Sequence, residues 1–181
     1  MKQNYSLYLY KTLTVLALTF LICLGAQIRI PMGEVPIVMT SLVIYTGSLI
    51  FGAHISFSAT LLYIILGSLG LPVFSGGSAG YQQLSGPTGG YLIGFVLSSF
   101  LIGKISDKQR KLKFDMLALL AGSASIHALG ILWMSSHFPE NWLKMREIYP
   151  VFLIADSLKV IVSLLFTRFL RLFPIHRNNT D

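Results

Sequence analysis

A long stretch without charge limits what this chain can fold into. No Asp, Glu, Lys or Arg occurs from Val35 to Gly103, which is 69 consecutive residues. A soluble domain carries about 25% charged residues, whereas this chain of 181 residues has 12% charged and 54% hydrophobic residues. A soluble protein of this size cannot leave so long a stretch bare of charge. The sequence therefore predicts an integral membrane protein in the lipid bilayer.

The apolar segments have the length of membrane-spanning helices. A helix needs about 20 apolar residues to cross the bilayer core, and the alternating apolar and polar residues typical of barrel strands are absent. We predict an all-α protein in which residues 1–181 form one domain, because every apolar segment must pack on the others. Its six transmembrane helices are roughly 12–28, 36–53, 55–71, 87–103, 115–136 and 150–170.

The basic residues predict the orientation of these helices. If both termini are cytoplasmic, ten Lys and Arg residues lie in cytoplasmic segments and three in external loops. The ten are Lys2, Lys11, Lys104, Lys108, Arg110, Lys111, Lys113, Arg168, Arg171 and Arg177, and the three are Arg29, Lys144 and Arg146. Basic residues mark cytoplasmic loops, so this bias predicts cytoplasmic termini. It also explains the net charge of +7 without a nucleic-acid partner.

Patterns typical of catalysis or metal binding are missing from the sequence. It contains no HExxH, no GxSxG and no paired carboxylates in one segment. The histidines are scattered, and we interpret His127 as a packed helix residue rather than a ligand. The glycine-rich GPTGGY (86–91) lacks the Lys-Ser/Thr of a nucleotide-binding loop. We therefore predict no enzyme, no metal and no cofactor.

The segment around GPTGGY instead suggests a cavity on the external side. The preceding loop, LPVFSGGSAGYQQLSG, carries no charge, so it is either a lid over an apolar cavity or a flexible connector. We predict Pro87 as the first residue of the next helix, whose free N–H groups face the cavity. Tyr91 offers a ring and a hydroxyl to that cavity. Gly90, Gly94 and Ser98 form a small face for close helix packing.

Asp156 and Lys159 lie inside the last apolar segment. A charge at the middle of a bilayer costs roughly 2.5–3.5 kcal/mol on insertion scales, and at this spacing the two residues share a helix face. They form an ion pair, provide a proton site, or bind a ligand. Asp accepts hydrogen bonds and Lys donates them, so together they match a cyclic urea, which has N–H donors and a C=O acceptor.

Four segments together resemble a known family. They are AQIRIPMGEVPI, LYIILGSLGLPVFSGG, GPTGGYLIGF and ADSLK. They resemble BioY, the biotin-binding S component of energy-coupling factor (ECF) transporters. The resemblance implies a six-helix S-component fold in the cell membrane, with biotin held near the extracellular face under the external loops. It also implies two kinds of partner, a transmembrane T component and a pair of ABC ATPases.

The resemblance also implies which residues contact biotin. Asp156 and Lys159 would be polar contacts, Ser78 would touch the bicyclic head, and Gln27 and Tyr91 would line the site. Lys159 serves either the ureido oxygen or the valerate carboxylate. Arg29 is a second candidate for that carboxylate, or else an interfacial anchor.

Two other functions remain open. One is a solitary proton-coupled carrier for biotin or another small vitamin, with Asp156 as its proton site. The other is a structural membrane subunit that binds no small ligand.

Overall fold

The computed structural model describes residues 2–33, 35–108 and 111–172. Arg110 and Arg177, two of the predicted cytoplasmic basic residues, lie outside these ranges. The helices are α1 (Lys2–Gln27), α2 (Thr40–Ser68), α3 (Gln82–Ser85), α4 (Gly89–Lys108), α5 (Leu112–His137), α6 (Pro139–Met145) and α7 (Tyr149–Leu172). A 3-10 turn, η1 (Ser75–Gly77), precedes α3. The strands β1 (Arg29–Ile30) and β2 (Ile37–Val38) pair antiparallel after α1.

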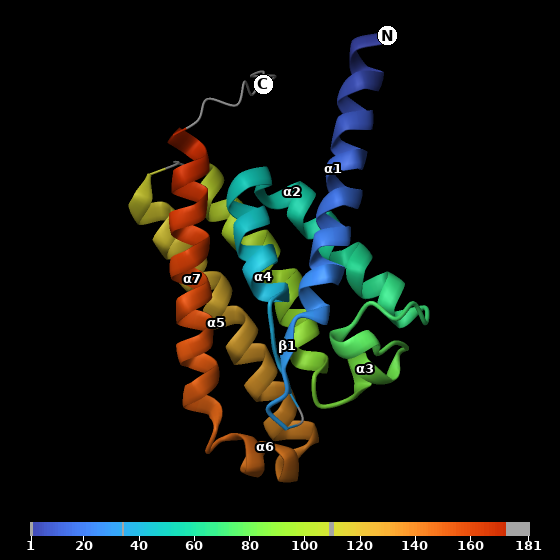
Figure 1. The fold of residues 1–181 in the computed structure, drawn as a ribbon, viewed down its shortest axis with the longest axis vertical. Helices are drawn as coiled ribbons and strands as arrows, with labels where there is room; N and C mark the ends of the chain where they lie inside the picture. Colours follow the sequence, from blue (N-terminus) through green and yellow to red (C-terminus); the bar gives the residue numbers. More distant parts are fainter. Residues whose placement is uncertain (1, 34, 109–110, 173–181) are drawn as a thin grey trace.

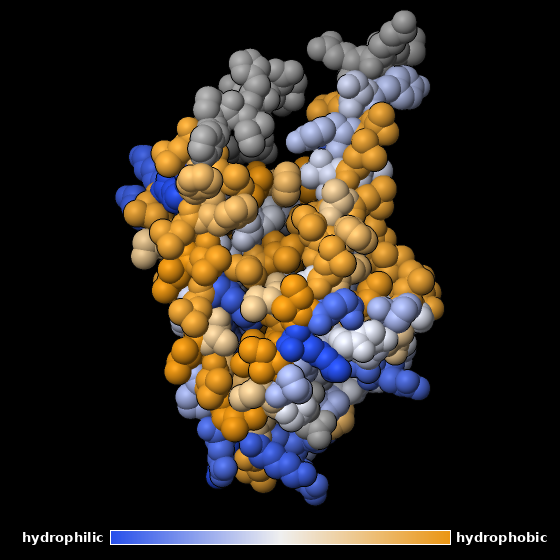
Figure 2. Space-filling view, in the orientation of Figure 1, coloured by the Kyte–Doolittle hydropathy of each residue, from blue (hydrophilic) through white to orange (hydrophobic). Residues whose placement is uncertain are grey.

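Five helices in the described ranges are long and apolar enough to cross a membrane: α1, α2, α4, α5 and α7. Their outward faces expose large apolar side chains such as Leu13, Phe20 and Leu165. Figure 2 shows apolar residues over most of this face, with hydrophilic residues at the lower end, near the middle and at the upper left. Lipid, rather than water, suits such a surface. The chain is thus an all-helical, multi-pass membrane protein.

The predicted spans 36–53 and 55–71 form a single element, α2, with a sharp bend. Gly52 interrupts its helical backbone at φ +80° and ψ −178°, a conformation that essentially only glycine adopts without strain. The backbone N–H of Ala53 donates to the Asp107 carboxylate at 3.3 Å. Figure 1 shows α2 turning back at its upper end. Six predicted helices therefore correspond to five long elements, with the predicted turn near His54 replaced by the bend at Gly52.

The small face of α4 packs against α5. A Cβ on Gly90 or Gly94 would collide with Trp133 or with the backbone of Ile126, and Gly122 approaches Ser98 from the α5 side. These contacts confirm the close packing predicted for the Gly90, Gly94 and Ser98 face.

The start of α4 differs from the prediction. The helix begins at Gly89, and the Thr88 carbonyl accepts its first bonds, from the N–H groups of Tyr91 and Leu92. The Thr88 hydroxyl donates to the Gln83 carbonyl at 3.1 Å. Pro87 thus lies in the turn before the helix and is not its first residue.

The short elements gather at one end of the bundle. Figure 1 shows the β1–β2 hairpin, α3 and α6 toward the lower end, while α1 begins and α7 finishes at the upper end. The external loops predicted from the sequence are the segments that contain these short elements. The β1–β2 hairpin, η1 and α3 contribute residues to the cavity described next.

Candidate functional site

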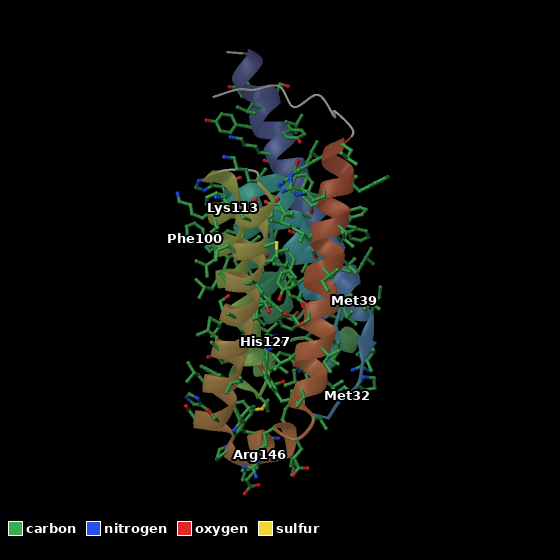
Figure 3. All side chains as sticks on the ribbon, turned by 90° about the vertical axis from the view of Figure 1, so that its left-hand side faces the viewer. Met32, Met39, Phe100, Lys113, His127 and Arg146 are labelled. Carbon is green, nitrogen blue, oxygen red and sulfur yellow. The ribbon has the colours of Figure 1, made fainter. Side chains whose placement is uncertain are left out.

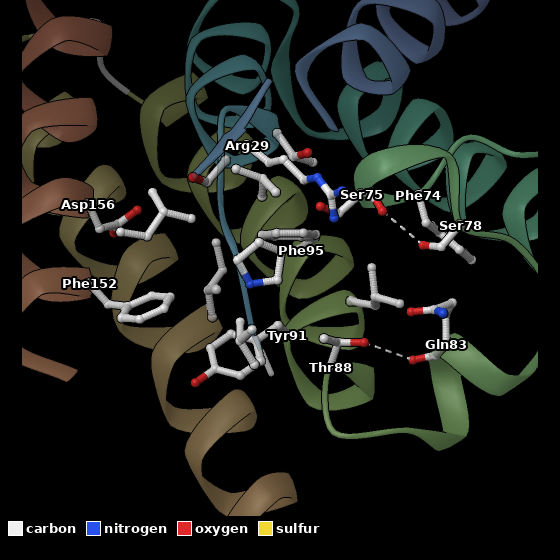
Figure 4. Close-up of a pocket in the computed structure, with 18 of the residues that line it drawn as sticks. Arg29, Phe74, Ser75, Ser78, Gln83, Thr88, Tyr91, Phe95, Phe152 and Asp156 are labelled. Atoms are coloured by element: carbon white, nitrogen blue, oxygen red, sulfur yellow. Dashed lines mark hydrogen bonds between the residues drawn. The ribbon is translucent and has the colours of Figure 1, made fainter. Parts of the chain in front are cut away.

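A cavity of about 310 Å³ lies between the short elements and the helices. Ligand pockets usually have volumes of about 300–1,000 Å³ and a mostly apolar lining with a few polar groups. The apolar lining includes Tyr63, Phe74, Phe95, Ile126 and Phe152. In Figure 4, Asp156 and Phe152 approach from one side, and Ser78 and Gln83 lie on the other. The cavity therefore has polar groups at both sides of an apolar middle.

Asp156 is held by four contacts from α2 and α5. Its side chain lines the cavity, although the residue is only 6% exposed. The Tyr45 hydroxyl donates to Oδ2 at 2.9 Å and lies 3.1 Å from Oδ1. Ser123 Oγ donates to Oδ2 at 2.5 Å, and His127 Nε2 lies 3.3 Å from the same oxygen. Oδ2 is therefore crowded with donors, whereas Oδ1 keeps most of its capacity to accept.

Lys159 lines the same cavity from one turn further along α7. Its Nζ donates to Ser41 Oγ on α2 at 3.1 Å. No direct ion pair joins Lys159 to Asp156 within the described part of the chain. Mutual neutralisation by an ion pair is thus not how the structure accommodates the two charges. An ammonium group has three donors, so Lys159 has donors to spare toward the cavity.

Tyr91 and Ser78 also line the cavity, as the sequence predicted for Tyr91. The ring of Tyr91 packs over Gly130 of α5, where a Cβ would collide with it. The Ser78 hydroxyl donates to the Ser75 carbonyl at 3.0 Å, so its oxygen can still accept a hydrogen bond from a ligand.

Gln27 does not lie among the residues that line the cavity. It is exposed at the end of α1, and its amide nitrogen donates to the carbonyls of Val73 at 3.3 Å and Phe74 at 3.2 Å. Gln27 therefore contacts the loop that covers the cavity, and this loop separates it from the cavity itself.

The uncharged loop 71–86 is an ordered cover. Phe74 is 2% exposed, packs edge-on against Tyr63 at 5.4 Å and occupies the space beside Gly67. The Gly80 N–H donates to the Gly67 carbonyl at 2.8 Å. Further along, Trp133 Nε1 donates to the Gly86 carbonyl at 3.0 Å. These attachments favour a lid over a flexible connector.

Sequence reasoning missed four polar residues beside the charged pair. Tyr45 and Ser41 come from α2, and Ser123 and His127 come from α5. The one available signal was the spacing of Ser123 and His127, four residues apart and so on one helix face. Arg29 lines the cavity as well, and its guanidinium lies over Gly76 of η1. This places Arg29 at the cavity but does not decide between its two predicted roles.

Comparison with known proteins gives a consistent result. A sequence profile of the BioY family matches residues 1–174. The chain is 32% identical to the biotin transporter BioY of Thermotoga maritima over 88% of this chain and 94% of that protein. It is 33% identical to the biotin transporter BioY of Rhodobacter capsulatus over 87% and 90% of the two chains. The crystal structure of the S component for biotin from an ECF-type ABC transporter matches with a TM-score of 0.83 and 25% identity, covering 93% of this chain and 94% of that one. The chain therefore belongs to the BioY family.

Proposed function

We propose that this protein binds biotin in the cavity between the loop 71–86 and α7, as a transport subunit and not as an enzyme. The observation that carries the proposal is the pair of charged side chains, Asp156 and Lys159, which lie one turn apart in the lining of a largely apolar cavity. Oδ1 of Asp156 accepts an N–H of the ureido ring, and Lys159 donates to the ureido oxygen or to the carboxylate. The relatives named above are biotin transporters and an S component for biotin, which supports this choice of ligand.

The remaining polar groups suit the rest of the ligand. Ser78 lies across the cavity from Asp156 in Figure 4, where its oxygen can accept a hydrogen bond from the second ureido N–H of the bicyclic head. Tyr91 and Phe95 provide the apolar wall between the two polar sides. Biotin has a matching distribution, because its ureido ring carries an N–H on each side and most of the remaining molecule, up to the carboxylate, is apolar.

The first experiment is calorimetry of biotin binding to the purified protein, with Asp156→Asn and Lys159→Met beside the wild type. A hydrogen bond to a charged group contributes about 1.5–3 kcal/mol, so each variant should bind biotin about tenfold to 150-fold more weakly. Lys104→Met is the matched control, because Lys104 is exposed near the far end of α4 and should leave binding unchanged. If the wild type produces no binding heat and retains no biotin, the proposal is wrong.

We also propose six membrane crossings with both termini in the cytoplasm. The bend at Gly52 supports two crossings by α2, and the other four long helices add four. The common end for the start of α1 and the finish of α7 supports an even number. The bias of basic residues supports the cytoplasmic side. Biotin would then be captured at the extracellular face of the cell membrane, where the loop 71–86 covers the cavity.

Transport itself is proposed to need partners. By its family, the subunit works with a T component and a pair of ABC ATPases that hydrolyse ATP. The solitary proton-coupled carrier is the alternative, and the contact of His127 with Asp156 is the observation that favours it. Biotin uptake in cells with and without the ATPases, each with and without a proton uncoupler, separates the two. Uptake that needs the ATPases and survives collapse of the proton gradient supports the S-component proposal, and the reverse result refutes it.

A further inference from the structure

His127 occupies an unusual position for a histidine in an apolar helix. Its Nδ1 lies 2.6 Å from the Tyr149 hydroxyl, and its Nε2 lies 3.3 Å from Oδ2 of Asp156. Both partners belong to α7, so the imidazole bridges two side chains that are seven residues apart on that helix. Figure 3 shows His127 on α5, on the side that faces α7.

The hydrogen-bonding chemistry of Asp156 and Tyr149 indicates which ring nitrogen of His127 carries a proton. A carboxylate oxygen only accepts hydrogen bonds, whereas a tyrosine hydroxyl both donates and accepts. The nitrogen that faces Asp156 must therefore carry a proton, while the one that faces Tyr149 is satisfied with or without one. Nε2 is buried and forms no hydrogen bond to the described residues. Oδ2 lies 3.3 Å away, so a small turn of the ring would give the Nε2 proton an acceptor.

Ser123 acts from the same helix face. It lies one turn before His127 on α5 and donates to the same oxygen, Oδ2. Tyr45 completes the set from α2. Because these donors converge on Oδ2, the carboxylate has one favoured orientation, and Oδ1 is the oxygen with room for a further partner.

We propose that His127 is a positioning residue, which turns slightly to donate from Nε2 to Oδ2 of Asp156 and so keeps Oδ1 available for an N–H of the ligand. The inference rests on the proposed function, because it assigns His127 a part in biotin binding. It revises the interpretation of His127 as a residue that only packs. His127 acts through Asp156 and need not touch the ligand, although it lines the cavity.

The test compares two substitutions at His127 with one at another histidine. His127→Leu removes the donor and keeps an apolar side chain of similar bulk. His127→Gln keeps an amide N–H that can donate to Asp156. His54→Leu is the matched control, since His54 is exposed and follows the bend at Gly52, near the end of α4 that lies away from the cavity. Biotin affinity is measured by calorimetry for each protein after its thermal unfolding confirms that it is folded.

We expect His127→Leu to bind biotin at least about tenfold more weakly, as for a lost bond to a charged group. His127→Gln should recover most of that loss, and His54→Leu should bind like the wild type. Wild-type affinity in His127→Leu would overturn the inference while leaving the proposed function intact. An equal loss in both His127 variants would also overturn it, because ring packing would then be the cause. A wild-type protein that binds no biotin would refute the proposed function, and this inference with it.

A second measurement detects the proton on the His127 ring directly and does not depend on biotin. Nitrogen NMR of protein labelled at histidine reports which ring nitrogen is protonated, and the His127 signals are those absent from the His127→Gln spectrum. We expect a protonated Nε2 whose shift changes in Asp156→Asn. An unprotonated Nε2 would overturn the inference, even if His127→Leu failed to fold.

Discussion

Replacing Gly103 by Ala tests the way in which the bend of α2 meets α4. Gly103 lies in the last part of α4, directly against the backbone of Gly52 and Ala53. A Cβ at this position would lie under 3.0 Å from three backbone atoms, one of which is the Gly52 carbonyl carbon at 2.6 Å. Carbon atoms in favourable contact are about 3.5–4.0 Å apart. The two segments would therefore have to separate locally by about 1 Å.

The expected cost follows from two opposing effects. Overpacking a well-packed core costs typically 1–3 kcal/mol, and the upper part of this range applies because the obstacle is backbone and cannot rotate away. An alanine in place of glycine favours the helix by about 1 kcal/mol. The net destabilisation is then about 2 kcal/mol. For a protein of this length, 1 kcal/mol shifts the midpoint of thermal unfolding by about 2–4 °C, so Gly103→Ala should lower it by about 4–8 °C.

The assay is thermal unfolding of the purified protein in detergent, and Gly25→Ala serves as the control. A Cβ on Gly25 would lie 3.1–3.2 Å from its neighbours, among them a flexible Val43 methyl group. This contact needs a shift of only a few tenths of an ångström, so Gly25→Ala should lower the midpoint less than Gly103→Ala does. A Gly103→Ala protein as stable as the wild type would refute the packing of the bend on α4.

Two further predictions concern the cavity. Trp133→Phe removes the hydrogen bond from Nε1 to the Gly86 carbonyl and keeps an aromatic ring against Gly90. It should destabilise the protein by about 1 kcal/mol. It should also speed the release of bound radiolabelled biotin. Lys159→Met should raise the unfolding midpoint of the protein without biotin. Lys159 is half-buried, and among the described residues Ser41 Oγ is the acceptor found for it. A fully buried group without a partner costs about 1–3 kcal/mol, and the half-buried ammonium group costs part of that. A lower midpoint would contradict this prediction.

Much of the architecture was predictable because lipid imposes simple rules. The uncharged stretch from Val35 to Gly103 indicated membrane helices, and the ends of the long helices agree with the predicted spans to within a few residues, except at the start of α1 and at the end of α4. The placement of Asp156 and Lys159 at an internal cavity followed from the cost of exposing charge to lipid.

The contacts between helices were not predictable in the same way. Tyr45, Ser123 and His127 look like ordinary polar residues in apolar segments, and only the rotation and tilt of α2 and α5 bring them to Asp156. Asp115 shows the same limit. In the sequence it follows the basic segment 104–113, yet its side chain is fully buried and accepts from Ser106 Oγ at 2.7 Å and from Arg171 Nη1 at 2.6 Å. Periodicity reports which face of a helix is apolar but not which neighbour that face meets.

Asp156 and Lys159 differ in how many hydrogen-bond partners the protein gives them. This difference determines which hydrogen-bonding groups the ligand must supply. Asp156 has Tyr45, Ser123 and His127 around it before any ligand arrives, so the protein itself offsets most of the cost of burying its charge. Among the described residues, Ser41 is the acceptor found for Lys159, and its spare donors are available to a ligand in the cavity that it lines. A ligand that offers a strong acceptor to Lys159 therefore gains more from this site than one that offers only donors to Asp156. On the proposed function, the acceptor oxygens of biotin provide most of the affinity, and the ureido N–H groups provide the orientation.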